Sequence, residues 1–397
     1  MPGDADNQAL QLLQSCCRVQ LTEDDRKRLL DKVSNTSNWD QVVDLAIDHR
    51  VDGFLLKQLR SVDKANLLGE REERLSNRTK RSSMCNLALA RELVQLLQQL
   101  SAVGIRAIPY KGPVLMQQVY GDVGLRATHD IDILIRPQDR DETERIVRER
   151  GFELMTEKSA LGRWVQSRLE KDSEWYHPER ELHLEVHWRF AKWYFPFSLD
   201  GRSFAEGLRE YDWAGHPFQL MPLEETLLTL CLHGSVHQWH RLEMLTMVAE
   251  FCRITTNLNW ERLEQITTRG SGIRPLLLGL KLAHAHLDAP VPSKFLEQAD
   301  ADPVVQRLAQ VVERNWMANQ HHFSLLDTMN FELSLLATRR SRVRYLLGQF
   351  VIAVLRPFTL REREAGKTAA RPLDLARRHS LGPGAVLRLL SKVLHIH

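Results

Sequence analysis

The segment His129–Pro137 (H-D-I-D-I-L-I-R-P) constrains the fold more than any other part of the chain. Side chains in a strand alternate between faces, so an extended segment places Asp130 and Asp132 on one face and the isoleucines on the other. We therefore predict a strand over Asp130–Ile135 with one apolar, buried face. The two carboxylates repel each other unless a cation lies between them, and Mg²⁺ is the usual hard cation bound by protein oxygen atoms.

A glycine turn precedes this strand in the sequence. Ile105–Pro109 is predicted to form a short strand that stops at Lys111 and Gly112. Pro113 can then open a helix over Val114–Tyr120, because the first helical position needs no N–H donor. A glycine turn that leads into a helix N-terminus is a common phosphate-binding arrangement. The turn is therefore a candidate anion site beside the acidic strand.

A second alternating segment lies further along the chain, at Glu181–Phe190 (E-L-H-L-E-V-H-W-R-F). Its alternation predicts a strand. Leucines and a valine then occupy one face, and His183, Glu185 and His187 occupy the other. These three polar side chains are candidate site residues.

Helical patterns dominate the chain after Pro222. In the segment Leu223–Trp239 and just beyond it, His233, His237 and His240 follow one another at spacings that share a helix face. No H-E-x-x-H motif accompanies them, so a catalytic zinc site is not indicated. Packing inside the helical region and a place in a substrate cleft both remain open for these histidines.

The order of patterns predicts an α+β protein in three parts. Residues 1–103 form an N-terminal helical region, residues 104–221 form a mixed α and β core, and residues 222–397 form a C-terminal helical domain. Helical spacing of apolar residues predicts helices over Asn7–Val19, Glu23–Val33, Trp39–Asp48, Leu87–Leu100 and Arg140–Arg150. The pattern of Leu161–Asp172 is ambiguous, and we predict a helix there.

Composition limits the classes of function. No apolar run approaches the roughly 20 residues that a membrane helix needs, and the N-terminus is polar and acidic. The five cysteines are scattered, without metal or disulfide spacing. We therefore expect a cytoplasmic protein without a membrane span. The net charge of +3 is small, but the segment from Arg339 carries thirteen Lys and Arg against three acids. This basic tail is either a solvated surface or a surface for RNA or a membrane.

The acidic strand and its preceding turn resemble a known family. The pattern K-G-x-x-L…Y-G-D-x-G-x-R-x-x-x-D-I-D-I-L, which starts at Lys111, resembles bacterial nucleotidyltransferase family proteins of the DNA polymerase β-type superfamily. The resemblance extends to Leu184–Trp188 and to the segment around His233, and so covers about half of the chain. It implies a small mixed β-sheet nucleotidyltransferase core.

The resemblance also implies roles for individual residues. Asp130 and Asp132 would bridge two Mg²⁺ ions, or Mn²⁺ ions, and Glu185 would be the third carboxylate, on a neighbouring strand. Lys111, Gly112 and Arg126 would contact the nucleotide or organise its site. The substrate cleft would hold the side chains of His187, His233, His237 and Arg241. We predict that the last three of these face the carboxylate strand.

Two positions depart from the pattern of the family. Pro113 stands where the superfamily usually has a serine that contacts phosphate. Met247 stands where relatives tend to have an aspartate after the histidine segment. Both departures bear on how the nucleotide and the acceptor are held.

The function implied is Mg²⁺-dependent transfer of a nucleoside monophosphate from an NTP to an acceptor hydroxyl or phosphate, with release of pyrophosphate. The expected acceptor is a small molecule or a modified peptide. One alternative is a toxin-type transferase that modifies RNA or protein, with the basic tail holding nucleic acid. Others are a non-catalytic relic that binds nucleotide or a partner, and a metal phosphohydrolase built on His183, Glu185 and His187.

Overall fold

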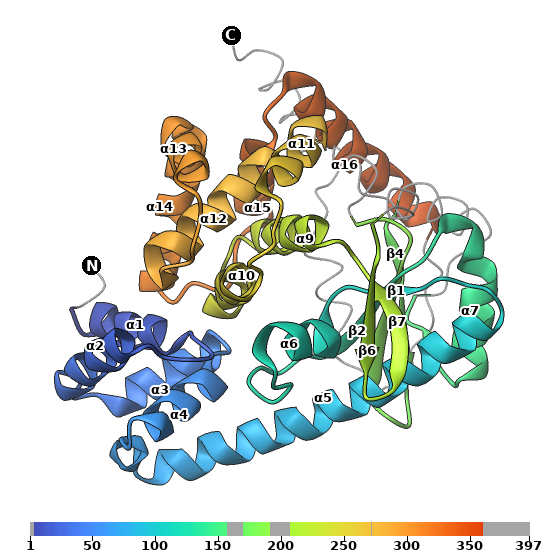
Figure 1. Ribbon diagram of the computed structural model, residues 1–397. Coiled ribbons are helices and arrows are strands. Elements are labelled where there is room, and N and C mark those ends of the chain that lie inside the picture. Colours follow the sequence, from blue (N-terminus) through green and yellow to red (C-terminus); the bar gives the residue numbers. More distant parts are fainter. Residues whose placement is uncertain (1–3, 157–169, 191–206, 271, 360–397) are drawn as a thin grey trace.

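The computed structural model describes residues 4–156, 170–190, 207–270 and 272–359. The chain has the predicted α+β fold, in which helices surround a small mixed sheet (Figure 1). Five strands form the sheet, in the order β1-β2-β5-β4-β3. Their bounds are Ile108–Pro109 (β1), Asp130–Leu134 (β2), Glu153–Leu154 (β3), Asp172–His177 (β4) and Leu182–His187 (β5).

The pairing of β2 with β5 fixes the two faces of the sheet. These strands are parallel, and Asp132 lies directly opposite Glu185. Residues opposite each other on neighbouring strands share a face, so both carboxylates project from the same side. On the other side, Ile131, Ile133 and Leu184 are fully buried. The predicted alternation of both strands therefore holds in the fold.

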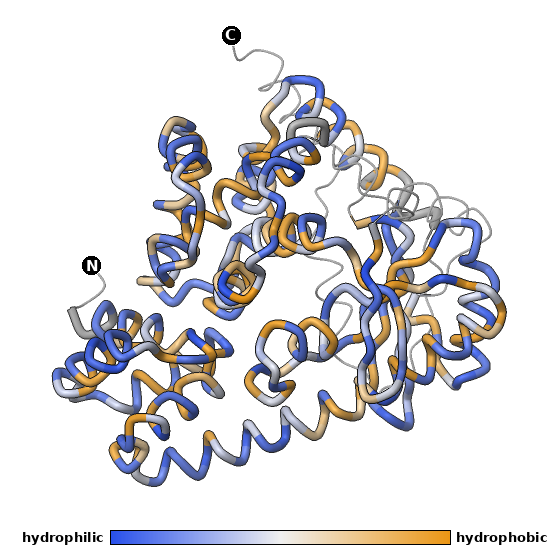
Figure 2. Tube along the Cα trace, viewed as in Figure 1, coloured by the Kyte–Doolittle hydropathy of each residue, from blue (hydrophilic) through white to orange (hydrophobic). Residues whose placement is uncertain are grey.

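The N-terminal part of the chain is helical. Its elements are α1 (Asp4–Cys16), α2 (Glu23–Ser34), α3 (Trp39–Asp48), α4 (Asp52–Ser61), the short 3₁₀ helix η1 (Ala65–Leu68) and α5 (Glu70–Ala102). Helix α5 is 33 residues long and runs from these helices to the sheet (Figure 1). Its charged first half lies beside α3 and α4, where Leu75 is buried in the core and arginines 71, 74 and 78 pair with aspartates 40, 44 and 52. Its hydrophobic second half packs on the sheet (Figure 2).

The remaining helices cover the sheet and form a C-terminal group. Helix α6 (Gly112–Tyr120) follows β1, and the 3₁₀ helix η2 (Pro137–Asp139) and α7 (Arg140–Glu149) follow β2. A hairpin of β6 (Arg209–Trp213) and β7 (His216–Leu220) then leads to the helices. These are α9 (Leu223–Val236), α10 (Leu242–Ile254), α11 (Trp260–Gly270), α12 (Ile273–Leu287), α13 (Ser293–Ala301), α14 (Pro303–Met317), α15 (Leu325–Leu335) and α16 (Arg339–Thr359).

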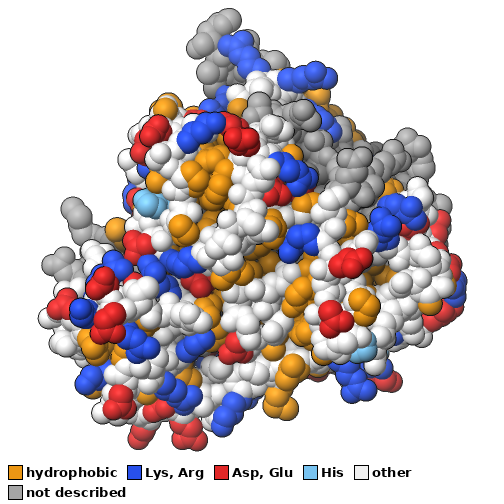
Figure 3. All heavy atoms as spheres, in the orientation of Figure 1, with side chains coloured by type: hydrophobic (Ala, Val, Ile, Leu, Met, Phe, Trp, Pro, Cys, Tyr) orange, Lys and Arg blue, Asp and Glu red, His pale blue; other side chains and the backbone are white. Residues whose placement is uncertain are grey.

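Two large hydrophobic cores are formed by the described residues, beside a small cluster around Tyr110. One of the large cores joins α1–α4 to α6 and to the C-terminal helices, so the N-terminal and C-terminal helices share a single interior. The other lies between the sheet, α5 and α7. Acidic and basic side chains are interspersed over the N-terminal helices on the face shown in Figure 3, as the small net charge suggests. Among the described helices, none is both long and apolar enough to cross a membrane.

Two predicted elements differ from the structure. The helix predicted over Leu161–Asp172 is wrong at its end, because Asp172 begins strand β4, while residues 161–169 lie outside the described residues. In β4, Ser173, Trp175 and His177 are buried on one face, which is the alternation of a strand. The helix predicted over Leu223–Trp239 ends at Val236, because Gln238 and Trp239 both have positive φ.

Candidate active site

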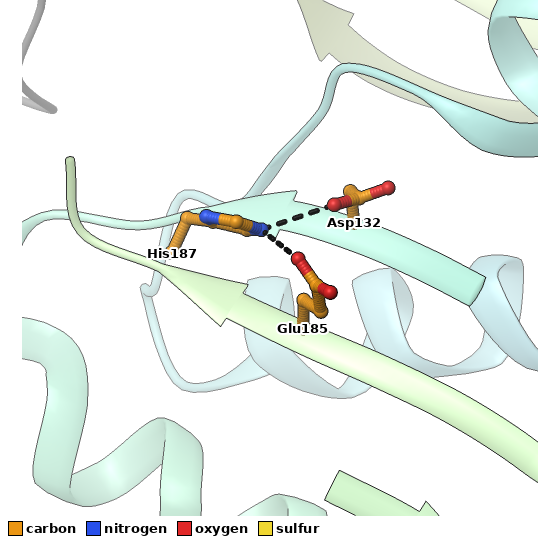
Figure 4. Close-up of side chains that lie close together, drawn as sticks. All are labelled: Asp132, Glu185 and His187. Atoms are coloured by element: carbon orange, nitrogen blue, oxygen red, sulfur yellow. Dashed lines mark hydrogen bonds and ion pairs between the residues drawn. The ribbon is translucent and has the colours of Figure 1, made fainter. Parts of the chain in front are cut away.

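The polar face of the sheet gathers side chains from β2, β4 and β5. Asp132 and Glu185 project from neighbouring strands, and His187 follows Glu185 on the same face (Figure 4). One ligand atom from each of these three residues lies within 4.8 Å of the other two. Asp130 lies two residues before Asp132, on the same face of β2 and opposite His183. It accepts a hydrogen bond from the Thr128 hydroxyl at 3.4 Å.

His187 stands at the centre of this group. Its Nε2 atom lies 3.0 Å from Oδ1 of Asp132 and 3.0 Å from Oε2 of Glu185. Its side chain is completely buried, and its ring packs edge-on against Tyr110 at 5.2 Å between centroids. Sequence reasoning placed His187 in a substrate cleft, whereas the fold places it among the carboxylates.

Two lysines border the carboxylates. Nζ of Lys111, from the turn before α6, lies 3.3 Å from Oδ1 of Asp132. Lys171, just before β4, contacts Asp172 and lies 3.9 Å from Oε2 of Glu185. Lys171 and Asp172 were not predicted, because they fall in a segment whose pattern is ambiguous. Their strand could be recognised only from the alternation that follows them.

The charges around the site do not balance. Four carboxylates, those of Asp130, Asp132, Asp172 and Glu185, meet two ammonium groups, those of Lys111 and Lys171. With His187 neutral, two negative charges remain in a largely buried place. One remains when His187 is protonated, the form favoured by the hydrogen bonds to Asp132 and Glu185, which raise the pKa of its imidazole against the effect of burial. Buried charge that lacks a partner is costly, so the group is compensated by protonation or by a bound cation.

These surroundings shift the pKa values of Asp130 and Glu185 in opposite directions. Burial raises the pKa of Asp130 to about 6, and the charges of Asp132 and Glu185 add to this effect. Burial also acts to raise the pKa of Glu185, but the hydrogen bond and charge of His187, with the nearby lysines, hold that pKa well below its usual range. The predicted repulsion between carboxylates is therefore concentrated on Asp130.

The residues fit a divalent cation. Two carboxylates and an imidazole are ordinary metal ligands, and their atoms already converge. Oδ2 of Asp132 is buried and has no hydrogen-bond partner among the described residues. Native proteins rarely leave such an oxygen without a partner, so a missing ligand at this atom is a direct explanation.

The glycine turn meets the acidic strand closely. Gly112 has φ +66, and a Cβ atom there would lie 3.1 Å from the carbonyl oxygen of Asp130. Pro113 occupies the first turn of α6, and Lys111 precedes the helix. The turn therefore presents the start of α6 beside the first residue of β2, which is the placement that a phosphate site needs.

Arg126 is tied to the helical region. Its Nε atom lies 3.2 Å from Oε2 of Glu243 in α10, and the other oxygen of Glu243 lies 3.5 Å from Nη1 of Arg50. Met247, at the position where an acid was expected, is buried one turn later in α10. Glu243 thus supplies an acid to Arg126 from a neighbouring turn of the same helix.

The predicted cleft residues lie in different surroundings. Burial holds the pKa of His233 well below its usual range. The charges of His237, Lys111, Arg126 and Lys171 lower that pKa further. The rings of His233 and His237 are 4.5 Å apart, and His237 is exposed.

Arg241 contacts the N-terminal helices. Its Nε donates to the backbone oxygen of Asp48 at the end of α3. Its described contact therefore joins the C-terminal helices to the N-terminal helices.

A comparison with protein families identifies the chain at a general level. Residues 35–288 match the model of a family described as an uncharacterised nucleotidyltransferase. The match covers well over half of the sequence and includes the sheet and α9, so the chain belongs to this family. No curated protein matches the chain.

Proposed function

We propose that this member of the family transfers a nucleoside monophosphate from an NTP to an acceptor hydroxyl or phosphate and releases pyrophosphate. The observation that carries the proposal is the register of β2 and β5, which sets Asp132 opposite Glu185 with a buried carboxylate oxygen left free. The resemblance to DNA polymerase β-type nucleotidyltransferases supports the same reaction, because those sites use carboxylates from neighbouring strands.

Asp130, Asp132 and Glu185 are the proposed holders of the metal, with Mg²⁺ or Mn²⁺ as the ion and two ions in the complete site. Bound there, the metal would neutralise triphosphate charge and lower the pKa of the acceptor hydroxyl. Burial and the charges of Asp132 and Glu185 raise the pKa of Asp130. A bound cation would favour its ionised form.

The turn before α6 is the proposed triphosphate site. Lys111 reaches Asp132 and can shift its ammonium group to an incoming phosphate without leaving the site. The close approach of Gly112 to β2 keeps that phosphate near the carboxylates. Arg126 has the role of organising the site, because its guanidinium is engaged with Glu243.

The acceptor is proposed to bind on the side of α9, beside His233 and His237. Burial and nearby charges hold the pKa of His233 well below its usual range, so its ring is neutral and can accept a hydrogen bond from a hydroxyl. This chemistry suits a small molecule or a modified peptide that carries a hydroxyl. Arg241 is not needed for this contact.

The test is a product analysis with labelled nucleotides. Each of the four NTPs, labelled at the α- or γ-phosphate, is incubated with the protein, Mg²⁺ or Mn²⁺, and the small-molecule fraction of a cell extract. We expect one NTP to release pyrophosphate and to pass its α-label to a new species. Asp132→Asn should lose both signals, and Asp63→Asn, at an exposed site, should keep them. Release of free phosphate, or equal release by Asp132→Asn, would contradict the proposal.

A further inference from the structure

We infer that His187 is itself a ligand of the metal, through Nε2, and that the site therefore prefers Mn²⁺ to Mg²⁺. This inference rests on the proposed function, because it concerns the cation of the same site. It departs from a site made of carboxylates alone, which is the arrangement that the sequence resemblance implies. Three independent features of the structure support it.

The first feature is the spacing of the ligand atoms. Nε2 of His187 lies 3.0 Å from an oxygen of Asp132 and 3.0 Å from an oxygen of Glu185 (Figure 4). Two ligand atoms at right angles around an octahedral ion, each about 2.1 Å from it, lie about 3.0 Å apart. Nε2 therefore already lies at the spacing of a neighbouring ligand from each of the two oxygens.

The second feature is the group behind the imidazole. Oδ2 of Asp172 lies 3.5 Å from Nδ1 of His187, and Lys171 contacts the carboxylate of Asp172. A histidine that binds metal usually donates its other ring N–H to a carboxylate, which fixes the ring and leaves the first nitrogen free. Nδ1 of His187 makes no hydrogen bond among the described residues, so a small approach of Asp172, which Lys171 contacts, would supply this carboxylate.

The third feature is burial. His187 is completely buried and Asp132 is 2% exposed, and Oδ2 of Asp132 has no hydrogen-bond partner among the described residues. Glu185 remains partly open to solvent. The site therefore has a buried side, where Oδ2 of Asp132 is available as a ligand atom. Its other side, at Glu185, is accessible to an ion and a nucleotide.

The imidazole nitrogen of His187 determines which divalent ion the site prefers. Mg²⁺ is bound almost entirely through oxygen and keeps several waters. Divalent transition ions accept imidazole more readily, and Mn²⁺ also accepts carboxylates. With one imidazole and two carboxylates, the site matches Mn²⁺ better than Mg²⁺.

The most direct test needs no variant. Mn²⁺ alone is added to the full chain without nucleotide, and electron spin echo modulation is recorded from the bound ion. We expect modulation from a directly bound imidazole nitrogen. Mg²⁺ should displace the Mn²⁺ only at a concentration at least about tenfold higher. Bound Mn²⁺ without nitrogen modulation, or the absence of Mn²⁺ binding, would overturn the inference.

Variants of single side chains supply the matched comparison. His187→Gln should remove the modulation and weaken Mn²⁺ binding by about 10–100-fold, and Asp172→Asn should weaken it by about tenfold. His216→Gln makes the same exchange in β7, where the histidine hydrogen-bonds with Gln98 of α5, and it should change neither signal. Unaltered modulation in a folded His187→Gln protein would also overturn the inference.

Failure of the inference can be separated from failure of the proposed function. The same samples are titrated with the four NTPs in the presence of Mg²⁺. If an NTP binds in the presence of Mg²⁺ but bound Mn²⁺ shows no nitrogen modulation, His187 is not a ligand and the proposed transferase function still stands. Loss of both NTP binding and metal binding in the wild type would contradict both.

Discussion

Gly112 and Gly121 stand at the two ends of α6, and both have φ +66. They differ in what a side chain would meet. A Cβ atom on Gly112 would lie 3.1 Å from the carbonyl oxygen of Asp130, whereas nothing lies within 4 Å of a Cβ atom on Gly121. The pair therefore separates the cost of a left-handed backbone from the cost of disturbing β2.

We predict that both Gly→Ala variants lose about 1 kcal/mol of stability from the strained backbone. Only Gly112→Ala should also weaken NTP binding, by about tenfold, which corresponds to about 1.4 kcal/mol. Urea unfolding and nucleotide titration of both variants measure the two effects. Equal loss of NTP affinity in both variants would show that the contact between Gly112 and Asp130 has no role in the site.

Asp130 gives a prediction about pH. Its pKa is about 6 in the folded protein, against an ordinary value of 3.8. Between pH 3.8 and about pH 6, the folded state therefore binds a proton that the unfolded state lacks. Ionised Asp130 destabilises the fold above about pH 6, and this destabilisation disappears as the pH falls toward about 4. Without metal, Asp130→Asn should be more stable than the wild type at about pH 8, by on the order of 1–3 kcal/mol.

The gain from Asp130→Asn should shrink toward zero at about pH 4.5. Urea unfolding in a chelating buffer at both pH values measures it. Asp63→Asn, at an exposed position, should show no such dependence. A gain that is equal at both pH values would mean that Asp130 is not the residue that carries the repulsion.

At the residue scale, the sequence predicts part of the site. Alternation places Asp130 and Asp132 on one face, and it places Glu185 with His187. Alternation cannot say which residues of another strand come to lie beside them, because that depends on pairing between distant segments. Lys171 and Asp172 were missed for this reason, and so was the central position of His187.

At the scale of elements, Asn86 connects the long helix α5 to the acidic strand. Its side-chain amide donates to the backbone oxygens of Val123 and Arg126, at 2.6 and 2.7 Å, and its oxygen accepts from the N–H of Thr128 at 3.1 Å. Asn86 is completely buried. It therefore holds the segment that leads into β2.

We predict that Asn86→Ala costs about 2–4 kcal/mol, because it leaves buried backbone groups without partners. NTP binding should weaken as well, since the segment positions both Arg126 and β2. The matched control is Cys85→Ala, because Cys85 is exposed and immediately precedes Asn86 in α5. This variant should change stability little. A small stability loss in Asn86→Ala, similar to that of the control, would contradict this role.

Elements with a strong local pattern are the ones that the sequence predicts well. Apolar spacing predicts the second half of α5, but its charged first half packs on α3 and α4 through Leu75 and several ion pairs, which local spacing does not reveal. The hairpin β6–β7 was missed. Its turn places Ala214 and Gly215 at positive φ, and alanine is not a usual signal for such a turn.

At the scale of the whole molecule, the N-terminal helices pack against the C-terminal helices. Buried residues of α1–α4 and of α9–α15 belong to one core, so the two groups of helices support each other. Sequence patterns predict both groups of helices but contain no information on their contact. Glu243 is one charged link in this arrangement, because it meets Arg50 from the N-terminal helices and Arg126 from the core.

We predict that Glu243→Gln destabilises the protein by about 3 kcal/mol, because Glu243 is 4% exposed and its loss leaves two guanidinium groups without their carboxylate. Glu297→Gln, on the exposed side of α13, should change the free energy of unfolding by less than about 0.5 kcal/mol. Urea unfolding measures both. A similar small effect in the two variants would show that Glu243 does not join the parts of the molecule.

The central claim is that Asp132 and Glu185 form a cation-dependent NTP site. Calorimetric titration with non-hydrolysable analogues of the four NTPs, with Mn²⁺, with Mg²⁺ and with a chelator, tests it most directly. We predict that at least one analogue binds the wild type and Asp63→Asn only when a divalent ion is present. Asp132→Asn should bind it at least about 100-fold more weakly, a loss of about 2.7 kcal/mol. Binding that persists in the chelator, equal binding by Asp132→Asn, or no binding of any analogue to the wild type would contradict the claim.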